Sequence, residues 1–209
     1  MWPESDKTQE LLSGAKQGDP SAVNQLLDRH RRSIQRMIRM RLDQRIRARI
    51  DVSDVVQDVR VEANRRLRDY LDNPTMAFHL WLRQIAKDRI IDAHRRHRGS
   101  AKRSVDREQV AAPLGEERSG IELAAQLRDR QLTPAAAATQ QELARRVKQS
   151  LADLDEQDCE IIVMRHYEQL SNQEVAVALG LTEAAASMRY LRAVRRLRSL
   201  LYEPTSRGV

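Results

Sequence analysis

Residues 171–201 read SNQEVAVALGLTEAAASMRYLRAVRRLRSLL, and this stretch decides the fold class. Gly180 divides it into two segments, each with apolar residues at helical spacing. Gly180 can adopt the left-handed conformation that ends a helix, and Thr182 is a good N-cap for the next one, with Glu183 in its first turn. A tight glycine turn between two short helices is typical of a helix-turn-helix, whose second helix enters the DNA major groove.

The second of these helices combines an apolar stripe with a strongly basic surface. The stripe consists of Ala186, Tyr190, Ala193, Val194 and Leu197. The remaining surface carries Arg189, Arg192, Arg195, Arg196 and Arg198. An ordinary helical hairpin with a solvated basic face would show the same pattern, so the prediction of DNA binding also depends on the rest of the chain.

The overall composition favours a polyanionic partner. The chain has 209 residues, a formal net charge of +7 and a pI of about 10.0. Such a balance points to nucleic acid before a membrane surface. Only 3% of the residues are aromatic and 32% are charged, so we expect small, helical, aliphatic cores.

The single cysteine and the hydropathy pattern indicate a cytoplasmic protein. Cys159 excludes a disulfide framework within the chain, and its apolar helical surroundings predict a small core residue rather than a nucleophile. The start, MWPESDK, has no apolar signal region, and no run approaches the roughly 18 apolar residues of a membrane span. We therefore expect no membrane insertion.

The N-terminal third is predicted to be helical throughout. A short helix over residues 8–16 ends before Gly18, and the next one starts with Asp19 as N-cap and Pro20 in its first turn. Its apolar stripe continues to Leu42. Because β-type alternation is absent from the whole sequence, we predict an all-α protein.

Residues 51–67, DVSDVVQDVRVEANRRL, predict a helix with an acidic patch near its start. Asp51 or Ser53 would cap it, while Asp54, Gln57 and Asp58 would project from the first turns as an acidic island in a basic region. A plain solvated face is one interpretation. A metal site formed by Asp54, Asp58 and Glu62 at i, i+4 and i+8 is another, but no further ligand supports it. We favour an acidic docking surface for a basic protein partner. The predicted buried stripe is Val55, Val56, Val59, Ala63 and Leu67.

Residues 78–98, FHLWLRQIAKDRIIDAHRRHR, predict a long helix with a basic stripe. Phe78 and Trp81 lie near that stripe, and cations with aromatic rings suit a phosphate backbone with unstacked bases. His94 and His97 are three residues apart, but they lack a third ligand, so a metal site is not favoured. The expected core residues are Phe78, Trp81, Leu82, Ile85, Ile90 and Ala93, and the stripe is Lys87, Arg89, Arg95, Arg96 and Arg98.

Residues 99–139 differ from both flanks and predict a flexible connector. They contain Pro113, Pro134 and several glycines, and their acidic residues offset their basic ones. A short helix over 121–132 is the one element expected there. The chain is therefore predicted to form two small helical domains, at 8–98 and 140–203.

Three stretches, in this order, resemble one known family. The segment DVSDVVQDVRVEA resembles the polymerase-docking segment of bacterial sigma factors of the extracytoplasmic-function type, in the sigma-70 superfamily. The segment 78–98 resembles the promoter-melting helix of that family, and residues 151–201 resemble its minus-thirty-five domain. The resemblance covers roughly residues 8–98 and 141–201.

The resemblance implies a function and a set of contacts. The chain would bind core RNA polymerase and direct it to specific promoters, with DNA melting, while the polymerase supplies the catalysis; the resemblance also admits an anti-sigma factor as a further partner. No enzymatic activity, cofactor or metal is implied. The implied docking residues are Asp51, Asp54, Gln57 and Asp58. The implied minus-ten contacts are Tyr70, Trp81, Arg83, Lys87, Asp88, Arg89, Asp92, Arg95 and Arg96. The implied minus-thirty-five contacts are Thr182, Glu183, Ser187, Met188, Arg189 and Arg192.

Some positions depart from the family pattern. Asp88 stands where the family often has Asn, and Ser187 stands where it often has Lys or Arg, so the promoter preference cannot be transferred. The segment RDYLDNPTM, expected to be a polar loop, offers Tyr70 as the better candidate for a base contact, whereas Trp81 is expected mainly in the core. Two other functions remain open. One is a helix-turn-helix regulator that binds DNA alone, and the other is a metal-dependent nuclease.

Overall fold

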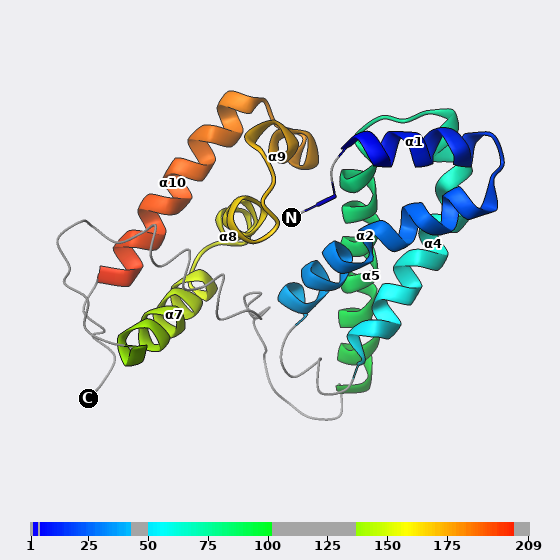
Figure 1. Cartoon of the computed structure of the whole chain (residues 1–209). Helices are drawn as coiled ribbons and strands as arrows, with labels where there is room; N and C mark the ends of the chain where they lie inside the picture. Colours follow the sequence, from blue (N-terminus) through cyan, green and yellow to red (C-terminus); the bar gives the residue numbers. More distant parts are fainter. Residues whose placement is uncertain (1, 4, 43–49, 102–136, 203–209) are drawn as a thin grey trace. The chain divides into compact units, whose positions relative to one another are not determined.

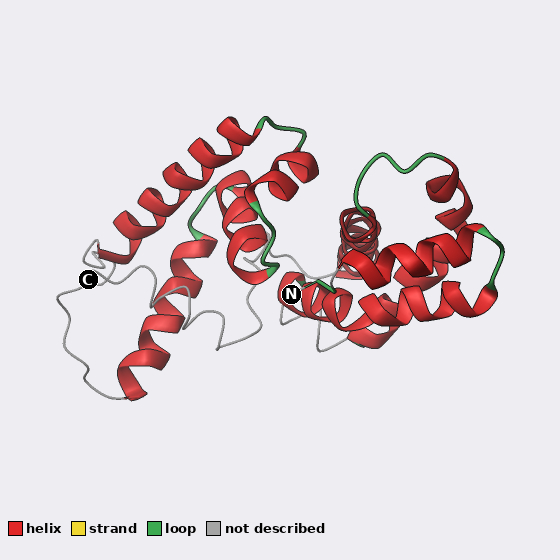
Figure 2. Ribbon diagram, turned by 45° about the horizontal axis from the view of Figure 1, so that its top comes forward, coloured by secondary structure: helices red, strands yellow, loops and turns green. Residues whose placement is uncertain are grey.

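The computed structural model describes residues 2–3, 5–42, 50–101 and 137–202, and these residues form helices with no strand (Figures 1 and 2). The prediction of an all-α protein is confirmed. The chain divides into two compact units, residues 1–109 and 110–209, which we describe separately.

In the described residues of the N-terminal unit there are four helices: α1 (Ser5–Lys16), α2 (Pro20–Arg41), α4 (Val52–Asp72) and α5 (Phe78–Ala101). Figure 1 shows α1 alongside α2, and α2 also packs on α4 and α5. The Asp19 carboxylate caps α2 by accepting a 2.8 Å hydrogen bond from the Ser21 amide, as predicted. For α4 the cap is Asp51, which accepts from the Ser53 amide at 2.8 Å, and not Ser53 itself.

The core of this unit is aliphatic with one aromatic cluster. All five residues of the predicted α4 stripe are buried, as are five of the six core residues predicted on α5; Trp81 is partly buried and packs against them. The cluster joins the end of α4 to the start of α5. The Tyr70 and Trp81 ring centroids are 4.7 Å apart, and Phe78 lies 5.6 Å from Tyr70 and 5.4 Å from Trp81. His30 of α2 meets the Phe78 ring edge-on at 5.1 Å.

The C-terminal unit contains α7 (Ala137–Ala152), α8 (Glu156–Ile162), a π-helical turn η1 (Val163–Tyr167), α9 (Asn172–Leu179) and α10 (Glu183–Tyr202). The long α10 packs on α7, α8 and α9. Its buried side is the predicted stripe, with Ala186, Ala193 and Leu197 fully buried and Tyr190 and Val194 partly so. Cys159 is buried in α8, as predicted.

The turn between α9 and α10 has the predicted geometry. Gly180 is left-handed, with φ +64°, and the Leu181 amide donates to the Ala176 carbonyl at 2.9 Å. Thr182 caps α10 by accepting from the Ala185 amide at 3.2 Å. Ser171 starts α9 with a reciprocal capping box to Glu174, which the sequence analysis did not predict.

Some boundaries differ from the prediction. α1 begins at Ser5 rather than Thr8, α5 runs on to Ala101, and α7 begins at Ala137, so both ends of the expected connector are helical. Gly99 does not end α5, because a helix tolerates an isolated glycine at a cost of about 1 kcal/mol. The helix expected over 121–132 lies outside the described residues.

Candidate nucleic-acid and protein interfaces

The first turns of α4 carry the predicted acidic island. Asp51, Asp54, Gln57 and Asp58 are all exposed, while Val55, Val56 and Val59 between them are buried. The helical period separates the two sets, because residues three or four apart share a face. The four polar residues therefore form one surface of the N-terminal unit, and the Asp51 side chain also caps the N-terminus of α4.

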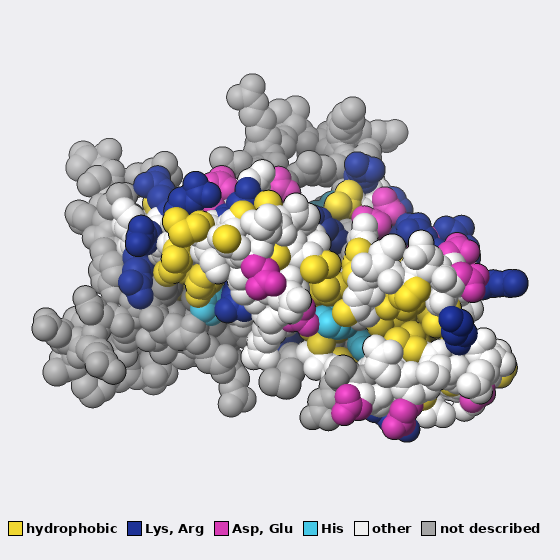
Figure 3. Space-filling model, turned by 90° about the horizontal axis from the view of Figure 1, so that it is seen from above, with side chains coloured by type: hydrophobic (Ala, Val, Ile, Leu, Met, Phe, Trp, Pro, Cys, Tyr) yellow, Lys and Arg dark blue, Asp and Glu magenta, His cyan; other side chains and the backbone are white. Residues whose placement is uncertain are grey.

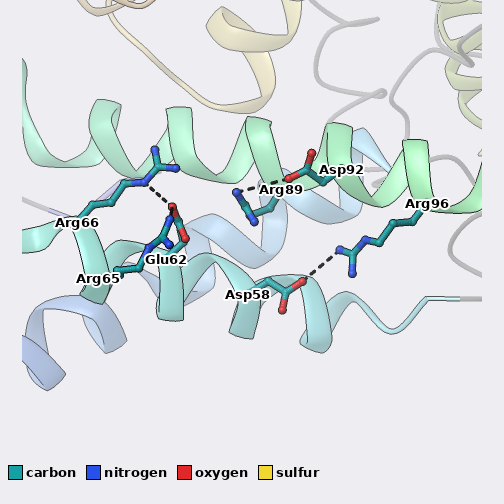
Figure 4. Close-up of polar contacts among 7 residues, drawn as sticks. All are labelled: Asp58, Glu62, Arg65, Arg66, Arg89, Asp92 and Arg96. Carbon is teal, nitrogen blue, oxygen red and sulfur yellow. Dashed lines mark hydrogen bonds and ion pairs between the residues drawn. The ribbon is translucent and has the colours of Figure 1, made fainter.

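One residue of this island reaches the neighbouring helix. The Asp58 carboxylate lies 3.3 Å from the Arg96 guanidinium, so an ion pair connects α4 to α5 (Figure 4). Further along the same two helices, Glu62 pairs with Arg65 at 2.7 Å and with Arg66, and Arg89 lies 3.5 Å from Asp92. Of these pairs, Asp58–Arg96 connects the two helices, and the others lie within α4 or within α5.

Arginines pair with Asp58 and Glu62, two of the three acids on which the metal hypothesis depended. The Glu62 carboxylate is buried, and its hydrogen bond from Arg65 lowers its pKa below the usual value. In the described part of the chain, no three His, Cys, Asp or Glu side chains lie close enough together to hold a metal ion. The carboxylates at 58 and 62 act here as partners for arginine.

An open groove of about 420 Å³ lies between α4 and α5. Its lining is almost entirely charged, with one exposed apolar side chain, Val61. The lining residues are Asp58, Val61, Glu62, Arg89, Asp92, Arg95 and Arg96. The groove therefore joins the acidic island to the basic stripe on a single surface.

The structure places most of the predicted minus-ten residues on the accessible side of α5. Asp88, Arg95 and Arg96 are exposed. The partly exposed residues are Trp81, Lys87, Arg89 and Asp92. Arg83 differs, because only 3% of it is exposed and it lies within the core of the unit.

The expectation that Tyr70 lies in a polar loop is wrong. α4 continues to Asp72, so Tyr70 belongs to its last turn, where its ring packs on Phe78 and Trp81 and is buried. Its hydroxyl donates a 2.9 Å hydrogen bond to the Met76 carbonyl, and burial raises its pKa. The apolar ring outweighs the polar neighbours Asp69 and Asp72, since burying an aromatic side chain contributes several kcal/mol.

In the C-terminal unit, the predicted groove-facing residues are accessible. Thr182, Glu183, Ser187, Met188 and Arg192 are exposed, and Arg189 is partly buried. The Asn172 amide donates to the Glu183 carbonyl at 2.9 Å, so the starts of α9 and α10 are joined directly. These contacts fix the angle at which α10 is presented.

The turn η1 also contacts α10, and the sequence did not predict this contact. His166 Nε2 and the Tyr190 hydroxyl share a 2.7 Å hydrogen bond, and the Arg165 guanidinium lies 5.6 Å from the centre of the Tyr190 ring. Arg165 also donates to the Leu170 carbonyl at 2.6 Å. No local sequence pattern predicts a π-helical turn, so the roles of Arg165 and His166 become visible only in the tertiary structure.

Leu191 was also missed as a surface residue. It is 46% exposed on α10, and Met188, one turn earlier, is 56% exposed. The signal was present in the sequence, because Leu191 falls outside the apolar stripe that begins at Ala186. A large apolar residue off the stripe of an amphipathic helix is predicted to be exposed, as Leu191 is.

The chain joins a helix-turn-helix unit to a helical unit that has an acidic face beside a basic helix. This combination is typical of a DNA-binding transcription factor. Comparisons with known proteins agree. Residues 26–100 match the family model described as Sigma-70 region 2, and residues 150–199 match that of Sigma-70 region 4. The chain is 32% identical over 200 residues to the RNA polymerase sigma factor NccH of Alcaligenes xylosoxydans xylosoxydans, covering 91% of this chain and 92% of that one.

A solved structure shows the same similarity. The structure of CnrH in complex with the cytosolic domain of CnrY matches with a TM-score of 0.58 and 27% identity, covering 94% of this chain and 97% of that one. The chain belongs to the sigma-70 family of RNA polymerase sigma factors, in its extracytoplasmic-function group. It is a factor that directs RNA polymerase to promoters. None of the described helices is both long and apolar enough to serve as a membrane span.

Proposed function

We propose that the acidic island of α4 is the surface that docks on core RNA polymerase. The single observation behind this proposal is the exposure of Asp51, Asp54, Gln57 and Asp58 on one face of a unit that is otherwise rich in arginine. An acidic face suits a basic partner surface, and it repels DNA, so it suits protein and not nucleic acid. Family membership supports the choice of partner.

The basic side of α5 is proposed to hold the melted minus-ten strand. Arg95 and Arg96 are exposed, and Lys87 and Arg89 are partly exposed about two turns earlier, on the two flanks of the exposed side of α5. Asp88 and Asp92 lie among them and are suited to accept hydrogen bonds from base amino groups. Trp81, which is partly exposed, is the nearest ring for stacking. The burial of Arg83 and Tyr70 favours supporting roles for these two residues.

α10 is proposed to enter the major groove of the minus-thirty-five element. Thr182 and Glu183 lie at its N-terminal end, followed by Ser187, Met188 and Arg192 on accessible positions and by Arg189, which is partly buried. In a helix-turn-helix the N-terminal residues of the second helix contact base edges. Arginines further along suit phosphates, which set the register of the protein on the duplex.

The proposed mechanism requires no covalent chemistry by this chain. Binding unpaired DNA more tightly than paired DNA shifts the equilibrium of the promoter towards the open state. The polymerase then synthesises RNA, and both proteins would work in the cytoplasm. Regulation by an anti-sigma protein is supported by the similarity to CnrH, which was solved with the cytosolic domain of CnrY.

A charge reversal at Asp58 tests the docking proposal. Asp58→Arg should weaken binding to core RNA polymerase by about 1–3 kcal/mol, because a repulsive pair replaces an attractive one. Asp72→Arg is the matched control, since Asp72 is an exposed residue at the far end of the same helix. Binding is measured by titrating labelled protein with core enzyme, and circular dichroism checks the helicity. Equal affinities for the wild type and Asp58→Arg would exclude the docking surface.

A further inference from the structure

The solvent-facing side of α10 is apolar near the start of the helix and basic further along. Opposite the buried side lie first Ala184, Met188 and Leu191 and then Arg192 and Arg195, all of them exposed. At about 100° per residue, Met188 lies roughly 200° around the axis from the buried Ala186. The apolar side chains therefore point directly away from the unit to which α10 belongs.

Packing does not explain these apolar side chains. α10 is held by Ala193 and Leu197 in the core, by the Thr182 cap, by Asn172 and by the His166–Tyr190 hydrogen bond, all of which act elsewhere on the helix. Single exposed apolar residues are common on protein surfaces. Met188 and Leu191 lie a single turn apart on the presented face of a helix-turn-helix, where they are open to a partner.

The charges around this surface indicate which partner it contacts. Arg192 and Arg195 continue the same face, and Figure 3 shows hydrophobic and basic side chains next to one another on the C-terminal unit. An apolar protein partner would have to leave those arginines unpaired or supply acids for them. A DNA duplex supplies phosphates for the arginines, and its major groove holds one strongly apolar group, the C5-methyl of thymine.

We propose that Met188 and Leu191 recognise thymine methyl groups in the major groove of the minus-thirty-five element. This inference rests on the proposed placement of α10 in that groove, and it adds the chemistry that is recognised. An apolar side chain gains by covering a methyl group. It loses when it covers the amino group of cytosine, because that donor would be cut off from water without a partner. The contact thus favours thymine over cytosine at the facing positions.

Deoxyuridine provides a direct test, since it lacks only the methyl group and pairs as thymine does. Holoenzyme is assembled from core RNA polymerase and the full chain, and a promoter that this holoenzyme transcribes in a run-off assay is chosen. Each thymine of its minus-thirty-five element is replaced in turn by deoxyuridine, and the affinity of the holoenzyme for the promoter is measured. Binding should weaken about fourfold at one or two positions, the equivalent of about 0.8 kcal/mol for one buried methyl. The effect at those positions should disappear in Met188→Ala or Leu191→Ala holoenzyme.

Val177→Ala is the matched control, because Val177 is 47% exposed and apolar but lies on α9. It should leave the deoxyuridine effect unchanged. The inference is overturned if no deoxyuridine weakens binding, or if the effect persists in both α10 variants. It is also overturned if Met188→Ala weakens binding to core enzyme in the absence of DNA, which would indicate a protein partner. The proposed function is judged separately by scrambling the upstream element. If scrambling leaves wild-type binding unchanged, α10 does not contact that element and both proposals fail.

Discussion

The Asp58 carboxylate on α4 lies 3.3 Å from the Arg96 guanidinium on α5. A residue proposed for polymerase docking is thus paired with one proposed for DNA binding. Their side chains are 48% and 63% exposed respectively. Such a pair contributes about 0.2–1 kcal/mol, so it is easily exchanged for stronger contacts. A polymerase surface that engages Asp58 would release Arg96 for the promoter.

Removing the charge of Asp58 should therefore raise the affinity of the free protein for single-stranded DNA. We expect up to about a fivefold gain for Asp58→Asn, because Arg96 loses the partner that competes with phosphate. Fluorescence anisotropy at low salt measures it. Asp72→Asn removes the same charge at a distance from Arg96, and an equal gain there would attribute the effect to net charge alone.

Tyr70 is expected to stabilise the N-terminal unit through its ring. Tyr70→Phe should cost about 1 kcal/mol, the value of the hydrogen bond to the Met76 carbonyl. Tyr70→Ala should cost about 3–5 kcal/mol, because it leaves a cavity beside Phe78 and Trp81. Urea unfolding measures both. If the Tyr70→Ala protein is stable but opens promoters slowly, and a premelted template restores its activity, Tyr70 contacts a base and does not mainly stabilise the fold.

Gly14 should not tolerate alanine, although alanine is normally the better helix residue. A Cβ atom at position 14 would lie 2.9 Å from the Cβ of Ala22, where α1 meets α2. The helical preference gains about 1 kcal/mol, while overpacking costs about 1–3 kcal/mol, so net destabilisation is expected. Thermal unfolding checks the sign, and Gly14→Ala combined with Ala22→Gly should restore much of the loss. A higher melting temperature for the single variant would show that the two helices separate freely.

His30 should make the N-terminal unit sensitive to mild acid. Burial, helped by the nearby charges of His79 and Arg29, lowers its pKa from 6.5 to about 4, even though the hydrogen bond that its Nδ1–H donates to the Leu26 carbonyl acts to raise the pKa. The unfolded chain then binds a proton at a higher pH than the folded chain does. The neutral form thus contributes stability that is complete above about pH 6.5 and is lost as the pH falls to about 4, about 3 kcal/mol in all. Urea unfolding across this range should show a shallower pH slope for His30→Leu. Equal slopes would assign the acid sensitivity to other groups.

Much of this molecule followed from local sequence. The cap at Asp19, the glycine turn at Gly180 and the Thr182 cap depend on residues within a few positions of one another, so they could be predicted and are confirmed. The acidic island and the α10 stripe depend only on the helical period, which sorts residues onto faces before any packing is known.

The tertiary structure decided which polar side chains are buried and with which distant residues they pair. Arg83 and Tyr70 look like surface residues in the sequence but lie in the core, because neighbouring helices cover them. The Asp58–Arg96 pair joins residues 38 positions apart, and the His166–Tyr190 pair joins residues 24 apart. Periodicity assigns a residue to a face of its own helix. What that face meets depends on how the helices cross, and the crossing is set by the fit of side chains from the whole unit.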